Sequence, residues 1–168
     1  MNKISLKNYE FEDYLLENVQ LFDEIFVELG ESPLLENENF APFLDFEIFS
    51  HYLVLECVSK KQNTIPIIIW FEGSDLVIDI DGNRESLEWS KKQIQEDRNS
   101  VLEFIRNLFT GYILVDYKGS SRFIQIFDSA GNLFHCFSYN NLFHMVTGRY
   151  LLNQKGYRNL YFPLFDKI

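Results

Sequence analysis

Six short runs rich in β-branched and aromatic residues constrain the fold most strongly, because the connections between them are short. They cover residues 46–58, 64–71, 75–80, 112–117, 122–127 and 133–139. Within each group of three, connections of three to five residues carry turn-forming Gly, Ser, Asn or Lys. Such connections join antiparallel neighbours, since a parallel crossover needs a dozen residues or more. The sequence therefore predicts a mainly antiparallel sheet of about six strands.

Two segments with helical periodicity lie outside these runs. Over residues 11–29, apolar side chains recur at three- and four-residue steps, and Gly30 follows where a left-handed C-terminal cap is expected. A looser apolar stripe covers residues 86–109 and weakens near Asp97, where a break can occur. We therefore predict an α+β fold with two main helices, in the order helix–three strands–helix–three strands. A length of 168 residues favours a single globular domain over residues 1–168.

The charges are concentrated in one third of the chain. Residues 8–59 contain thirteen Asp and Glu and no Lys or Arg. The rest of the sequence holds fifteen basic and twelve acidic residues, so this third accounts for the net charge of −10. A concentrated negative field speeds association with a basic partner and is screened by salt. The pattern therefore indicates a class of partner without indicating any chemistry.

Sequence motifs for catalysis or cofactor binding are not evident. The chain contains no C-x-x-C, H-x-x-x-H or H-E-x-x-H pattern and no glycine-rich phosphate loop. His135 and Cys136 are neighbours on a predicted strand, so their side chains should point to opposite faces. Asp79 and Asp81 alternate with apolar residues, lack the ligand spacing of a calcium loop, and are expected on the solvent side of a strand. We predict no catalytic residue, no metal ligand and no cofactor.

Membrane and nucleic-acid partners are also not predicted. The N-terminal residues lack the apolar core of a signal peptide, and the longest uncharged apolar stretch, residues 64–71, is far too short to span a bilayer. The two cysteines do not suggest a disulfide framework, so we expect a cytoplasmic protein. Basic and aromatic residues mix from Lys118 onward, as in single-strand nucleic-acid binders, but an isoelectric point near 4.7 argues against that function.

A small, acidic α+β chain with this charge gap and no catalytic motif resembles, in composition, the immunity proteins of bacterial toxin systems, including those of contact-dependent growth inhibition. The resemblance implies a protein that binds a cognate toxin domain, often a basic nuclease, and occludes its active site. We expect the partner-binding residues to be the acids of the first helix and the loop after it. They are Glu12, Asp13, Glu17, Glu24, Glu28, Glu31, Glu36 and Glu38. This expectation requires that cations from later in the chain leave these carboxylates unneutralised.

Other functions remain open at this point. A nucleic-acid mimic that inhibits or regulates a DNA-binding protein would use the same negative field. An enzyme of unrecognised family would need His135 or His144 in a deep cleft. A structural or oligomerisation module would show a large apolar surface patch, and an acidic face can also serve solubility alone. The sequence leaves the oligomeric state undetermined.

Overall fold

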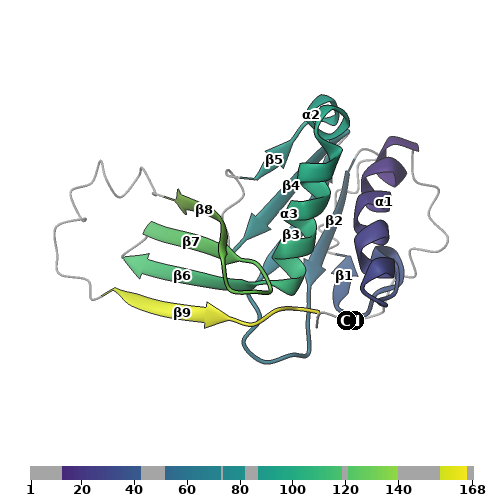
Figure 1. Cartoon of the computed structure of the whole chain (residues 1–168). Helices are drawn as coiled ribbons and strands as arrows, with labels where there is room; N and C mark the ends of the chain where they lie inside the picture. The colour runs from purple at the N-terminus through teal and green to yellow at the C-terminus, as the bar shows by residue number, and fades with distance from the viewer. Residues whose placement is uncertain are drawn as a thin grey trace. The chain divides into compact units, whose positions relative to one another are not determined.

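The computed structural model describes residues 13–42, 52–72, 74–81, 87–118, 121–139 and 156–165. These residues form an α+β fold with two antiparallel sheets, which confirms the predicted class (Figure 1). The chain divides into two compact units. We call residues 1–62, 66–106 and 168 the N-unit, and residues 63–65 and 107–167 the C-unit. The single domain expected over residues 1–168 stays a prediction.

The N-unit combines helices with a five-stranded antiparallel sheet. Its strands are β1 (Phe40–Pro42), β2 (Tyr52–Cys57), β3 (Ile67–Glu72), β4 (Asp75–Ile80) and β5 (Glu88–Trp89), and each pairs with its neighbours in sequence. The helices are α1 (Asp13–Glu28), the short 3₁₀ helix η2 (Leu34–Glu36), α2 (Lys91–Glu96) and α3 (Arg98–Thr110), of which residues 98–106 belong to this unit.

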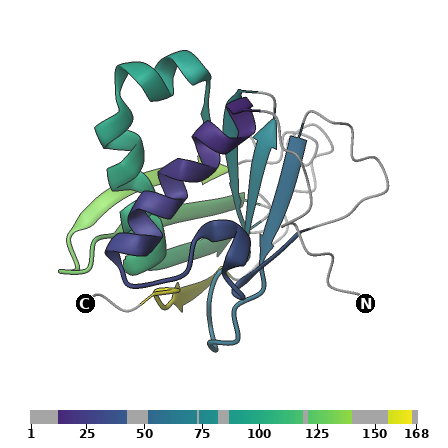
Figure 2. The same ribbon diagram turned by 90° about the vertical axis from the view of Figure 1, so that its right-hand side faces the viewer.

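Aromatic side chains pack α1 onto this sheet. The ring of Phe22 on α1 meets Phe71 on β3 edge to face at a centroid distance of 5.7 Å, and Phe26 stacks on Phe40 of β1. Figure 2 shows α1 running along the sheet. At its end, Gly30 has φ 72° and its N–H donates to Val27, while the N–H of Glu31 donates to Phe26. This is the predicted left-handed cap, and it turns the chain toward η2.

The C-unit contains a four-stranded antiparallel sheet in the order β8-β7-β6-β9. Its strands are β6 (Tyr112–Lys118), β7 (Ser121–Phe127), β8 (Leu133–Tyr139) and β9 (Tyr157–Tyr161). One face carries buried Ile and Val side chains of β6 and β7. A Cβ on Gly111 would lie 1.9 Å from the carbonyl oxygen of Phe127, so only glycine fits where the chain leaves α3 for β6.

Two parts of the predicted order need correction. The single six-stranded sheet is wrong, because the described residues form nine strands in two sheets. The helix expected over residues 86–109 begins only after Ser90, whose side chain forms a capping box with Gln93. The break anticipated near Asp97 is confirmed, and it divides this segment into α2 and α3. Residues 46–51 of the first strand-like run lie outside the described residues.

Candidate functional site

Three of the candidate partner-binding acids, Glu17, Glu24 and Glu28, lie on the outward side of α1. Its inward side holds fully buried Phe22, Ile25 and Phe26, while Glu24 and Glu28 are exposed. These positions separate because three- and four-residue steps keep apolar side chains on one side of a helix. Of the other predicted residues, Asp13 begins α1 but its side chain is not described, and Glu12 lies outside the described residues.

Cations from α2 and α3 pair with the carboxylates on this side of α1. Lys91 Nζ lies 2.9 Å from Glu17 Oε2, and Arg106 Nη2 lies 2.6 Å from Glu28 Oε2. Between these two pairs, the guanidinium of Arg98 holds both carboxylate oxygens of Glu24. The acids and cations follow each other in the same chain order, so the two helical segments run side by side in the same direction.

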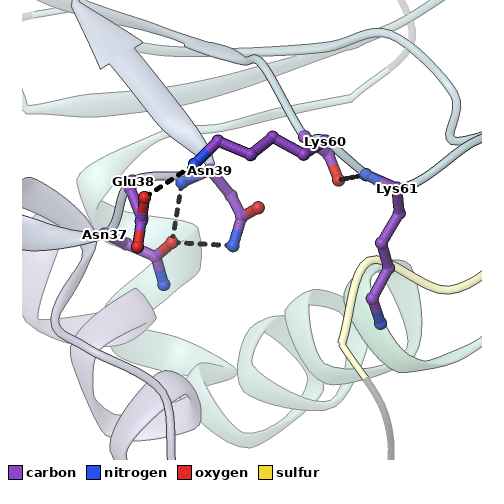
Figure 3. Close-up of polar contacts among 6 residues, drawn as sticks. Asn37, Glu38, Asn39, Lys60 and Lys61 are labelled. Atoms are coloured by element: carbon purple, nitrogen blue, oxygen red, sulfur yellow. Dashed lines mark hydrogen bonds and ion pairs between the residues drawn. The ribbon is translucent and has the colours of Figure 1, made fainter.

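A fourth pair lies after η2, where the chain enters β1. Lys60 Nζ lies 2.9 Å from Glu38 Oε2, with both side chains exposed (Figure 3). Next to it, the side-chain oxygen of Asn37 accepts hydrogen bonds from the backbone N–H and the side-chain amide of Asn39. Buried Asn37 therefore shapes the turn on which Glu38 is presented.

These four pairs correct the central expectation about the acidic face. Glu17, Glu24, Glu28 and Glu38, half of the eight predicted residues, already contact a cation from later in the chain. The effect on titration is clearest at Glu24, whose pKa is lowered because Arg98 donates hydrogen bonds to its charged form. The outward side of α1 is therefore a row of ion pairs rather than a row of isolated carboxylates.

The remaining acids gather where α1 leads into η2. Glu31 is half-buried and Glu36 is exposed. Beside them, burial raises the pKa of Asp23, and the negative charge of Glu36 raises this pKa further. The backbone N–H of Leu34, which donates to Asp23 Oδ1 at 2.7 Å, partly offsets the increase. The negative charge of Glu36 therefore acts on Asp23 across the turn between α1 and η2.

The two units differ in charge. By sequence, the N-unit holds twenty-two acidic and nine basic residues, a net charge of −13, whereas the C-unit holds three acidic and six basic residues, a net of +3. This sum already includes the cations that pair with α1. The ion pairs therefore redistribute the negative charge of the N-unit without removing it.

Among the described residues, the cysteine and histidine candidates do not come together, and His144 lies outside these residues. The β7–β8 register places His135 opposite Ile126 and Cys136 opposite Gln125, so their side chains point to opposite faces of the sheet. Burial raises the pKa of the Cys57 thiol, which disfavours the nucleophilic thiolate. Nothing in these contacts joins a thiol to a histidine.

Asp79 was placed wrongly by the alternation argument. Its side chain on β4 is 9% exposed, and all neighbouring positions from Leu76 to Ile80 are buried, so this strand is covered on both faces. Among the described residues, no group of three or more His, Cys, Asp or Glu side chains could hold a metal ion. Within the same residues, no helix combines the length and apolar composition needed to cross a bilayer.

The sequence contained one signal for the cations that sequence reasoning missed. Glu17 and Glu24 are separated by seven residues, and so are Lys91 and Arg98. Equal steps of two helical turns allow matched pairs when two helices run in parallel.

Comparison of the chain with protein-family models, curated proteins and solved structures gives no match.

Proposed function

We propose that this protein is an inhibitor of the immunity-protein kind, which binds a basic toxin domain through its acidic N-unit and occludes the toxin's active site. The observation that supports this proposal most directly is the net charge of −13 held within one compact unit. A surplus of this size raises the local concentration of a cationic partner and speeds its association.

The ion pairs change which residues should contact the partner. A carboxylate held by two hydrogen bonds from Arg98 offers little to an incoming Lys or Arg, because that cation must first displace the guanidinium. Glu31 makes no ion pair with a described residue and lies in the short segment between α1 and η2. We therefore assign the first contacts to the α1–η2 junction, and a smaller contribution to Glu17, Glu24 and Glu28.

Inhibition then has two separable steps. The negative charge of the N-unit attracts the toxin domain, which raises the association rate toward ~10⁸ M⁻¹s⁻¹ at low salt, from the ~10⁵–10⁶ M⁻¹s⁻¹ of uncharged surfaces. Docking at the α1–η2 junction then fills the cationic substrate groove of the toxin. Charged residues at an interface rim act mainly on the association rate, whereas buried anchors set the dissociation rate.

The test combines a growth assay with association kinetics. Its probe is the toxin domain that this proposal expects to be encoded beside the chain. Co-expression of the chain should restore growth of a bacterial host that produces the toxin domain. The association rate of the purified proteins should fall steeply as salt is added. Glu31→Lys should slow association and leave the free energy of unfolding nearly unchanged, since the side chain is only half-buried.

A charge-exchanged pair provides the matched control. Glu24→Arg alone adds two positive charges, whereas Glu24→Arg combined with Arg98→Glu keeps the net charge and restores an ion pair. If the net field drives association, the single variant associates more slowly and the exchanged pair matches the unmodified protein. If neither added salt nor Glu31→Lys changes the association rate, the N-unit is not part of the interface.

A further inference from the structure

Of the four sheet edges that the described residues form, three carry features that discourage pairing with another chain. The edge strand β1 has three residues and ends at Pro42, and β5 has two residues, one of them Glu88. On the edge strand β9, Arg158 forms a bidentate ion pair with Asp116 of β6. Short edge strands, prolines and charged side chains are the usual means by which proteins block such edges.

The fourth edge, β8, has none of these features. Leu133–Tyr139 reads LFHCFSY, seven residues without a charge or a proline. Along one side it pairs with β7, and no other strand among the described residues pairs with it. Leu133 is 53% exposed, and Cys136 and Ser138 are exposed as well. A long, uncharged, exposed edge of this kind offers a row of backbone donors and acceptors to another strand.

We infer that β8 is a homodimerisation edge, which pairs antiparallel with β8 of a second copy about a twofold axis. A twofold axis brings the central residue of β8 opposite its own copy, so a charge there would meet a charge of the same sign, and β8 carries no Asp, Glu, Lys or Arg. The seam belongs to the C-unit, so it includes none of the residues that give the N-unit its net charge of −13.

The exposed side chains of the sheet support a second copy as the occupant. Leu133 and Cys136 lie on the same face as Phe123 and Leu114, opposite the buried face that contains Ile124. Phe123 is 38% exposed there. Gln125 shares this face and lies between Leu114 and Cys136. Pairing of two β8 strands would shield part of the exposed Leu133 side chain from water. The twofold arrangement closes after two copies, so the edge is covered without forming a fibre.

The register of the pairing can be stated. If all seven residues of each strand overlap, the central residue, Cys136, lies opposite Cys136 of the second copy. Facing residues of antiparallel strands have Cα atoms about 4.5–5.5 Å apart, within the roughly 4.4–6.8 Å that a disulfide spans. Cys136 therefore serves as a reporter of the register. Cys57, the other cysteine, is largely buried and has a raised pKa, so it serves as an internal control.

The first measurement is the average mass of the full chain by sedimentation over a wide range of concentrations. A seam of two strands belongs to the small, transient interfaces of less than about 1,200 Å². The mass should therefore rise with concentration from 20.0 kDa toward twice that value and no further. Cys136→Lys places two ammonium groups opposite each other and should keep the chain monomeric. Ala130→Lys, which adds the same charge in the exposed turn before β8, should leave dimerisation unchanged.

The second measurement is disulfide cross-linking with diamide. Two thiols lose two protons and two electrons to the diamide, which is reduced to its hydrazine. The unmodified chain and Cys57→Ser should form a covalent dimer, and Cys136→Ser should form none. A monomeric mass at every concentration, a mass that continues to rise beyond the dimer, or equal cross-linking of Cys136→Ser would overturn the proposal. None of these readouts depends on toxin binding, so this proposal and the proposed function can fail independently.

Discussion

The Arg98–Glu24 ion pair should stabilise the fold by about 1 kcal/mol at neutral pH and low salt. The two side chains are 43% and 50% exposed, which places the pair among surface ion pairs worth about 0.2–1 kcal/mol. The guanidinium contacts both carboxylate oxygens, which favours the upper part of that range. A double-mutant cycle with Glu24→Gln and Arg98→Gln, followed by urea unfolding, measures this coupling free energy separately from the other contacts of each residue.

The coupling should depend on pH in one direction. Arg98 lowers the pKa of Glu24 below its ordinary value of 4.5, so the unfolded chain binds the proton more readily than the folded one. The contribution of the pair is therefore complete above the unfolded pKa and is lost as the pH falls through the folded pKa. The cycle repeated in acid should give a coupling near zero. Added salt at neutral pH should reduce it only in part, since the two groups are in contact.

The i,i+4 pair of Lys92 and Glu96 on α2 provides the control for this cycle. Its atoms are 3.7 Å apart and its side chains are 81% and 64% exposed, so we expect about 0.3–0.5 kcal/mol. A coupling between Glu24 and Arg98 that is no larger than this, or that persists in acid, would refute the reasoning. In that case the carboxylates of α1 would be as available to a partner as the sequence alone suggests.

Two further predictions concern the interior and the α1–η2 junction of the N-unit. Phe22→Ala should lower the free energy of unfolding in urea by about 3–5 kcal/mol, because the ring is fully buried against Phe71. Phe22→Leu should lower it clearly less. Similar losses for both variants would contradict this packing. Asp23→Asn should stabilise the fold near neutral pH. Burial raises the pKa of Asp23 above its ordinary value of 3.8, so ionisation of Asp23 weakens the fold as the pH rises through the folded pKa. The gain should vanish in acid, where Asp23 is protonated in both states, and unfolding free energies measured across the pH range would decide it.

The elements predicted correctly from sequence are those whose pattern is local. The stripe of α1 and its glycine cap, and the β-branched and aromatic runs of β3 and β6, each depend on neighbouring residues alone. The strands β1, β5 and β9 have only two to five residues, which is too few to show a period in the sequence. They form by pairing with a longer neighbouring strand. The division into two sheets also depends on which edges pair, which no local pattern records.

The candidate site, like the fold, has features that the sequence predicts locally and features that depend on distant contacts. The excess of acids in residues 8–59 can be counted directly, and so can its net charge. Whether a given carboxylate is paired depends on contacts between residues far apart in sequence, 74 positions for Glu24 and Arg98. Sequence reasoning therefore predicts the total charge of this surface but not its distribution. The seven-residue step shared by the acids and the cations was the only local trace of the pairing.

The distinction between total and local charge decides what the ion pairs mean for binding. An ion pair is a dipole, and its field falls off faster with distance than the field of a net charge. At a Debye length of about 8 Å, an approaching protein therefore senses mainly the surplus of thirteen negative charges in the N-unit, which pairing leaves intact. After contact, local pairing matters more than net charge, because a carboxylate that already accepts two hydrogen bonds from Arg98 binds a cation of the partner only weakly. Salt and net-charge variants should thus act on the association rate, whereas substitutions near Glu31 should act on association and dissociation together.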